Sequence, residues 1–129
     1  MKIHHIGYLT SGLARSLDEF IRLGYRVERE ASYDEIRDVH IAFVINDGYR
    51  VELIEPAGDR SPLKPLLARY KNTPYHICYE VSDLDAETAR LSEKGYTVFQ
   101  APAPAPCLDG CRVVFLLHRA MGIIELLEV

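Results

Sequence analysis

Apolar and polar residues alternate along several short stretches of the chain, which is the pattern of half-buried β-strands. In the first part of the chain residues 2–10 show this alternation, and residues 25–30, 39–46 and 49–55 are also predicted to be strands. Between the first two stretches, apolar side chains recur at the spacing of one helix face. They are Leu13, Leu17, Phe20 and Ile21. We therefore predict the order β-α-β-β-β, with a tight turn at Asp47-Gly48 between the last two strands.

The same order of elements is predicted again from residue 74 onward. The strands are residues 75–81, 96–100, 112–118 and 122–129, and the helix is residues 83–94 with Asp83 as its N-cap. The Pro-rich residues 101–110 are predicted to form a loop, because proline cannot donate a hydrogen bond within a sheet. A short helix is predicted to connect the two parts, with Ser61 as N-cap and Pro62 at its first position.

The two parts are also similar in sequence. Shifting the chain by 71 residues aligns 5–28 with 76–99, and eight of the 24 pairs are identical, His5 with His76 among them. We predict an α+β fold in which two tandem βαβββ modules form a curved mixed sheet, a cup with the helices outside. The 129 residues would make one domain, with module one at 1–56, a connecting segment at 57–73 and module two at 74–129.

Each module carries one His in its first strand and one Glu in its last strand, at matching places. Glu52 lies between Val51 and Leu53, so strand parity places its side chain on the face opposite theirs. Glu125 is placed in the same way, and His5 and His76 are expected on that same polar face of the sheet. A buried carboxylate is costly unless a cation or hydrogen bonds compensate it. Two imidazoles and two carboxylates are a suitable set for Ni, Co, Mn, Fe or Zn.

Composition and charge exclude several other kinds of protein. The hydrophobic content of 48% indicates a packed core, and the net charge of −4 without a basic stripe argues against nucleic acid as a partner. No apolar run is long enough for a membrane span, and the first residues do not resemble a signal peptide, so we expect a cytoplasmic protein. Three cysteines in such a chain are expected to be free thiols.

Four segments together resemble one known family: HHIGYLTSGL, VELIEPAGDRSPLKPLL, YHICYEVSDL and GIIELLE. They are similar to the vicinal oxygen chelate superfamily, which includes glyoxalase I, methylmalonyl-CoA epimerase, extradiol dioxygenases and bleomycin-resistance proteins. The nearest pattern is that of the epimerase. The resemblance implies that one divalent metal ion is held by His5, Glu52, His76 and Glu125. It also implies a homodimer and a small-molecule substrate, such as a CoA thioester or a glutathione hemithioacetal.

The chemistry implied by this resemblance is removal of an α proton while the metal stabilises the resulting enolate. Glu125 and Glu52 are the candidate proton-transferring groups. The epimerase pattern also has a Glu before the third strand that acts as a base, and an ungapped alignment places Ile36 there, between Glu35 and Asp38. The alternatives are a glyoxalase I-type lactoylglutathione lyase and a metal-free binding protein of the bleomycin-resistance type.

Several polar residues near these candidates are not expected to take part in metal binding. His4 aligns with Tyr75 in the repeat, and strand parity directs it toward the helices. Cys78 shares a face with His76 and is expected to be a buried, inert thiol. Asp38 and His40 are expected to be solvated strand residues. Substrate-binding residues are not identified.

Overall fold

The computed structural model describes residues 1–129 and divides them into two compact units. The N-terminal unit comprises residues 6–74, and the C-terminal unit comprises residues 1–5 together with residues 75–129. The first strand, β1 (Lys2–Leu9), therefore contributes to both units. The description of the whole chain as one domain with modules at 1–56 and 74–129 stays a prediction.

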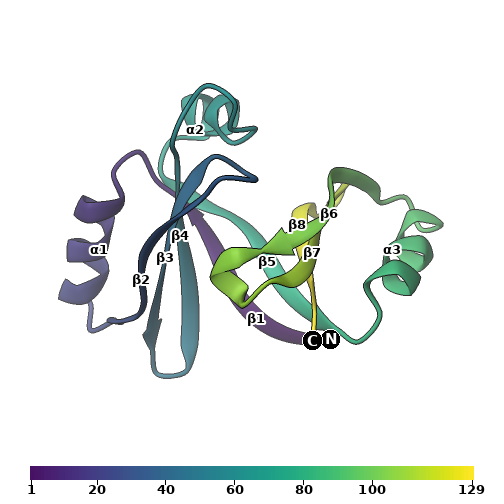
Figure 1. Cartoon of the computed structure of the whole chain (residues 1–129), viewed down its shortest axis with the longest axis horizontal. Coiled ribbons are helices and arrows are strands. Elements are labelled where there is room, and N and C mark those ends of the chain that lie inside the picture. Colours follow the sequence, from purple (N-terminus) through teal and green to yellow (C-terminus); the bar gives the residue numbers. More distant parts are fainter. The chain divides into compact units, whose positions relative to one another are not determined.

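In the N-terminal unit four strands follow the order β2-β3-β4-β1, with the helix α1 along one face (Figure 1). The elements are α1 (Leu13–Arg22), β2 (Arg26–Asp34), β3 (Val39–Asn46) and β4 (Tyr49–Pro56). The pairs β2–β3 and β3–β4 are antiparallel, whereas β1 and β4 run parallel. Asp47 and Gly48 have φ values of 51° and 79°, so the predicted tight turn between β3 and β4 is confirmed.

The core of the N-terminal unit lies between this sheet and α1. Its buried members come from α1, β3 and β4: Leu13, Ala42, Val44, Val51 and Leu53. The aromatic rings of Tyr8, Phe20 and Tyr25 pack edge to face against one another beside them. Because Val51 and Leu53 face the helix, Glu52 lies on the opposite face of β4, as predicted.

The connecting helix α2 (Lys64–Tyr70) begins later than predicted. Leu63, and not Ser61, precedes its first turn, which contains Pro65. The buried Ser61 instead accepts a hydrogen bond from the Leu63 amide at 3.3 Å, which forms a small turn ahead of the helix. The Ser61 hydroxyl therefore accepts a backbone N–H just before the helix and does not cap the helix itself. Serine favours both arrangements.

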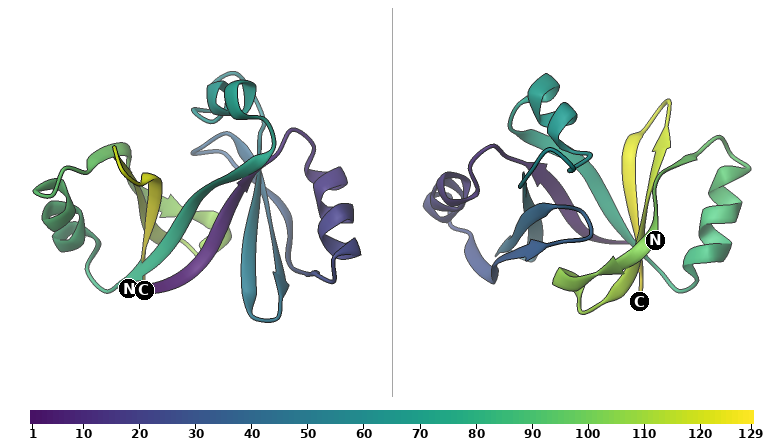
Figure 2. Two further views of the ribbon diagram at one scale, coloured as in Figure 1. Left: turned by 180° about the vertical axis from the view of Figure 1, so that it is seen from behind. Right: turned by 45° about the horizontal axis from the view of Figure 1, so that its top comes forward.

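In the C-terminal unit the strand order is β1-β5-β8-β7-β6, with α3 along one face (Figure 2). The elements are β5 (Thr73–Val81), α3 (Leu84–Ser92), β6 (Thr97–Ala105), the 3₁₀ helix η1 (Pro106–Leu108), β7 (Cys111–His118) and β8 (Gly122–Glu128). Strands β5 and β8 are parallel, and β8–β7 and β7–β6 are antiparallel. Asp83 caps α3 as predicted, because its side chain accepts from the Ala86 amide at 2.9 Å.

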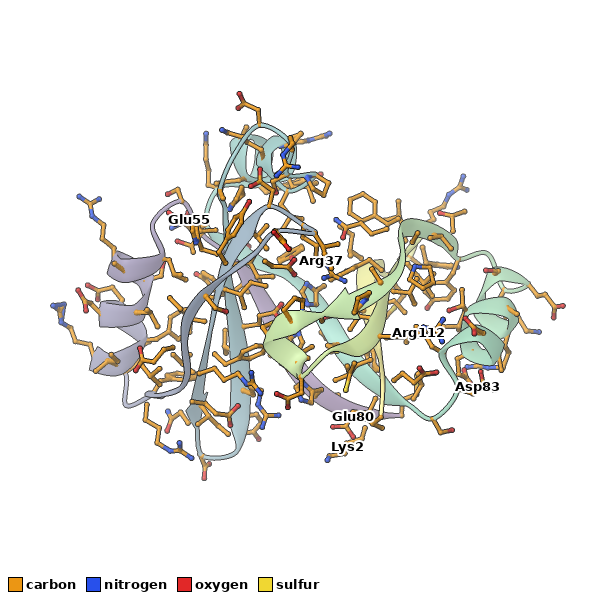
Figure 3. All side chains as sticks on the ribbon, viewed as in Figure 1. Lys2, Arg37, Glu55, Glu80, Asp83 and Arg112 are labelled. Atoms are coloured by element: carbon orange, nitrogen blue, oxygen red, sulfur yellow. The ribbon has the colours of Figure 1, made fainter.

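Polar contacts at the ends of the C-terminal unit connect its strands with one another and with α3. Lys2 on β1 lies 3.4 Å from Glu80 on β5, and both are labelled in Figure 3. Arg112 on β7 forms an ion pair with Asp85 in the first turn of α3, with 2.7 Å between Nη2 and Oδ1. That pairing raises the pKa of the guanidinium and lowers the pKa of the carboxyl. Most of this network is solvent-exposed, so we attribute little of the stability of the unit to it.

The prediction of a loop at residues 101–110 is wrong for its first half. Residues 101–105 continue β6, which pairs with β7 at the edge of the sheet. Prolines are tolerated there because the outer side of an edge strand needs no ladder hydrogen bonds. The strand pairing shifts between Val98 and Gln100 and again between Gln100 and Ala103, so Pro102 lies within the second irregularity, whereas Pro104 is paired with Arg112.

The core of the C-terminal unit repeats the arrangement of the first. Its buried residues come from β5, α3, β7 and β8: Val81, Leu84, Leu91, Val114, Leu116, Ile124 and Leu126. Glu125 lies between Ile124 and Leu126 and therefore on the face of β8 away from α3. The predicted α+β class and the repeated βαβββ order are confirmed. None of the helices has the length and apolar character that a membrane span requires.

Candidate metal centre

Three adjacent strands of the C-terminal unit each place one potential ligand on the face away from α3. His5 comes from β1, His76 from β5 and Glu125 from β8. All three residues are buried, with exposed fractions of 1%, 4% and 2%. Titratable residues are rarely enclosed in this way unless they are paired or bind a cation.

The three ligand atoms form a nearly equilateral triangle. His5 Nε2 and His76 Nε2 are 3.2 Å apart, and Glu125 Oε2 lies 3.0 Å from each of them. Two ligands bound at right angles to one metal ion, each at about 2.1 Å, would themselves be about 3.0 Å apart. The triangle therefore has the dimensions of one face of an octahedral coordination sphere.

The chemistry of the donor set also suits a cation. Glu125 Oε2 is buried and lies at ion-pair distance from both imidazoles, yet neither contact has the geometry of a hydrogen bond. A buried acceptor left without a hydrogen bond costs about 1–3 kcal/mol, more if it is charged. A divalent ion above the triangle would satisfy all three atoms together, so these residues fit the metal implied by the sequence.

Electrostatics keep the carboxylate of this triangle ionised. Burial alone raises the pKa of Glu125, but His5 and His76 outweigh burial and hold the pKa below its ordinary value of 4.5. A divalent metal requires an ionised carboxylate and neutral imidazoles, so metal binding would release the imidazole protons that pair with Glu125 in the metal-free site.

Two further residues adjoin the triangle. His4 Nδ1 lies 2.9 Å from His5 Nδ1, on the side of the imidazole that does not face Glu125. Cys78 is buried and in register with Glu125, and ligand atoms of His4, His5 and Cys78 all lie within 4.8 Å of one another. Strand parity predicts the direction in which the His4 side chain leaves β1, but it does not predict the position of the ring nitrogens, which lie beside His5.

Aromatic packing fixes the second imidazole. The ring of Tyr75 meets the ring of His76 edge to face, with centroids 4.5 Å apart, and Phe115 does so at 5.2 Å. Phe115 is itself buried and in register with Glu125 on the neighbouring strand. Apolar rings beside the ligands lower the local polarity, which strengthens electrostatic interactions within the triangle.

Glu52 belongs to the N-terminal unit. It is buried on β4, in register with Phe43 of β3 and with Gly7 of β1. Its predicted role as the fourth ligand stays a prediction.

The segment where the epimerase pattern has a base differs from expectation in one respect. Glu35 and Ile36 are exposed, but Asp38 is only 8% exposed, so the prediction of a solvated Asp38 is wrong. The Tyr33 hydroxyl donates to Asp38 Oδ1 at 2.6 Å, and this contact raises the pKa of Tyr33. Arg60 lies 3.9 Å from the same carboxylate oxygen. His40 is exposed, as expected.

The loop around Asp38 is held by local polar contacts. Asp34 is buried and accepts hydrogen bonds from the Ile36 and Arg37 amides and, at 2.9 Å, from the Arg37 guanidinium, which is labelled in Figure 3. A Cβ atom added at Gly58 would lie 2.7 Å from Asp38 Oδ2. The position of Asp38 therefore depends on a residue without a side chain at 58.

Comparison with known proteins shows which family the chain is similar to. Residues 4–115 match the Glyoxalase/Bleomycin resistance protein/Dioxygenase superfamily. The chain is 29% identical to the mitochondrial methylmalonyl-CoA epimerase of Dictyostelium discoideum, over 98% of this chain and 77% of that protein.

Solved structures are similar over nearly the whole chain. A Streptomyces coelicolor methylmalonyl-CoA epimerase variant in complex with 2-nitronate-propionyl-CoA has a TM-score of 0.81 at 28% identity, covering 99% of this chain and 94% of that one. A hypothetical protein from Bacillus halodurans C-125 has a TM-score of 0.86 at 22% identity, with the same coverage of both chains. At that identity the second likeness shows the fold alone.

Proposed function

Because the chain belongs to the glyoxalase/bleomycin resistance protein/dioxygenase superfamily, we propose that it is a divalent-metal-dependent isomerase of the methylmalonyl-CoA epimerase type. The observation that carries this proposal is the buried triangle of His5, His76 and Glu125, with ligand atoms 3.0–3.2 Å apart. The similarity to epimerases over nearly the whole chain supports the choice of reaction.

We further propose that Glu52 is the fourth ligand. It occupies the place in the first βαβββ series that Glu125 occupies in the second, and it lies on the face of its sheet away from the helix. Gly7, in register with Glu52, follows His5 by two residues on β1. Two imidazoles and two carboxylates favour Ni, Co, Mn, Fe or Zn over an ion that requires thiolate ligands.

In the proposed reaction a carboxylate takes the α proton of the thioester substrate, and a proton returns to the other face of the same carbon. When bound, the divalent ion supplies the positive charge that lowers the cost of the anion left by deprotonation. Glu125 and Glu52 are the proposed proton-transferring groups. Glu125 is ionised, with its pKa below the ordinary value, so it is ready to accept a proton at neutral pH although it is an intrinsically weak base.

The proposed substrate is a CoA thioester with a carboxylate on its α carbon. The support for it is that a related epimerase was solved with 2-nitronate-propionyl-CoA bound. The homodimer and the cytoplasmic location inferred from the sequence stay predictions, and light scattering that shows only a monomer at micromolar concentration would contradict the first.

A direct comparison of two substrates tests this function. The metal-loaded protein is incubated with one enantiomer of methylmalonyl-CoA and, separately, with the hemithioacetal of methylglyoxal and glutathione. We expect epimerisation of the thioester and no lyase activity on the hemithioacetal. Turnover of the hemithioacetal alone would favour the glyoxalase I-type lyase. Turnover of neither by folded protein that binds no metal would favour the bleomycin-resistance type of binding protein.

A further inference from the structure

We infer that His4 is a positioning residue for the metal centre, because it fixes the tautomer and the ring orientation of His5. The inference rests on the proposed metal-binding role of His5. Its basis is the contact between the Nδ1 atoms of the two neighbouring imidazoles, 2.9 Å apart, which is the ordinary length of a hydrogen bond between nitrogen atoms. The two rings meet edge to face with centroids 5.1 Å apart.

The role of His5 Nε2, on the other side of the ring, decides which of the two Nδ1 atoms donates this hydrogen bond. His5 Nε2 faces His76 and Glu125, so a metal there takes the lone pair of Nε2. A neutral imidazole carries a single N–H group, and in His5 that group must then be at Nδ1. His5 Nδ1 therefore donates to His4 Nδ1, and His4 carries its own proton at Nε2.

The second half of the chain achieves the same orientation by different means. The residue that matches His4 in the repeat is Tyr75, whose ring packs edge to face against His76 with centroids 4.5 Å apart. His76 is also in contact with Phe115, so its ring is held between two aromatic side chains. The ring of His5 contacts the rings of His4 and His76. Where the repeat has Tyr75 beside His76, it has His4 beside His5, and His4 offers a ring nitrogen that can accept a hydrogen bond.

Hydrogen-bond partners of metal-binding histidines typically contribute about 10- to 100-fold to metal affinity. We therefore expect His4→Phe, which keeps the ring shape but has no acceptor, to weaken Zn²⁺ and Co²⁺ binding by about 10- to 100-fold. The change His4→Asn places an amide oxygen near the position of Nδ1 and should restore most of that affinity. His40→Phe, the same change at an exposed histidine on β3, is the matched control and should bind both ions as tightly as the unmodified protein.

Affinity is measured by chelator competition on stripped full-length protein, with circular dichroism to confirm that each variant is folded. A spectroscopic readout separates positioning from general damage. In the Co²⁺-loaded protein, the shifted proton signal of His5 Nδ1–H should exchange slowly with solvent. In His4→Phe that signal should broaden or disappear, and in His4→Asn it should return.

A measurement on the unmodified protein keeps the inference testable if His4→Phe does not fold. Nitrogen NMR of the Zn²⁺-loaded protein should show His5 protonated at Nδ1, His4 protonated at Nε2, and a coupling across the hydrogen bond between the two Nδ1 atoms. If the unmodified protein binds Zn²⁺ tightly while His4 carries its proton at Nδ1, or if His4→Phe binds as tightly, the inference about His4 is wrong and the proposed function stands. If the unmodified protein binds no divalent metal, both are wrong.

Discussion

Replacing Glu125 with glutamine tests the two roles proposed for this residue. The change keeps the size of the side chain and one oxygen that can bind a metal, but it removes the negative charge and the ability to accept a proton. Glu125 Oε2 lies 3.0 Å from both imidazole nitrogens, and its side chain is only 3% exposed, so bulk water has little access to replace the missing carboxylate. Glu93→Gln, which removes the same charge from an exposed position after α3, is the control.

The expected effects on metal binding and on rate differ in size. Metal affinity should fall only modestly, because three of the four proposed ligands are unchanged and the amide oxygen remains. Loss of a positioned general base typically lowers a rate by about 10²- to 10⁴-fold, which corresponds to about 3–5 kcal/mol in the barrier. Proton exchange should therefore fall much further than metal occupancy.

The assay follows solvent deuterium incorporation at the α carbon of methylmalonyl-CoA, with the metal content of all variants set equal. Glu93→Gln should exchange at the rate of the unmodified protein. If Glu125→Gln also exchanges at that rate, Glu125 is a ligand only. The proton-transferring group would then have to be sought at Glu52, Glu35 or Asp38.

Three further outcomes follow from the structure. His76→Ala should lose most of its bound metal while circular dichroism stays unchanged, because the core packs on the other face of the sheet, and full metal retention would remove His76 from the ligand set. Gly58→Ala should lower the free energy of unfolding in urea by about 1–3 kcal/mol, since its Cβ would lie 2.7 Å from Asp38 Oδ2, and an unchanged value would show that Asp38 moves freely. The folded-state pKa of Glu125 lies below 4.5, so in metal-free protein its ionised form adds stability above that pH, and the contribution is lost as the pH falls toward the folded-state pKa. Metal-free unmodified protein should therefore lose unfolding free energy as the pH falls from about 4.5 to about 3, and an unchanged value over that range would contradict this assignment.

The fold was predictable because the spacing of apolar residues in helices and their alternation in strands decide which side chains face the core. The alternation around Glu125 and Glu52 placed both carboxylates away from the helices, and the structure agrees for each unit. The turn at Asp47-Gly48 was predictable because a tight turn needs positive φ values, which these residue types adopt readily.

The predictions from sequence were wrong where contacts with other segments decide between two possible local structures. Proline at residues 102 and 104 excluded an internal strand, but whether that segment joins an edge depends on which strand lies beside it. Ser61 could cap a helix or form a turn ahead of one, and the sequence pattern is the same for both.

The sequence repeat predicted that His5, His76 and Glu125 face the same side, and the structure brings the three together, but the repeat could not indicate the contact of His4 with His5. Repeats reveal what two halves share, whereas the contact between His4 and His5 occurs in only one half. Burial of Asp38 was missed because it depends on Tyr33 and on the loop containing Gly58, which are brought together by the pairing of β2 with β3 and by the chain that follows β4.

A metal titration followed by proton exchange tests whether this chain is a metal-dependent epimerase. Stripped protein receives increasing amounts of Co²⁺ or Ni²⁺, and solvent deuterium incorporation into methylmalonyl-CoA is measured at each step. We expect negligible exchange without metal, a linear rise in exchange with added metal and a break at one ion per chain, with no rise in His76→Ala at the same metal concentrations. Rapid exchange by protein shown to be free of metal, or exchange that does not depend on added metal, would contradict this expectation.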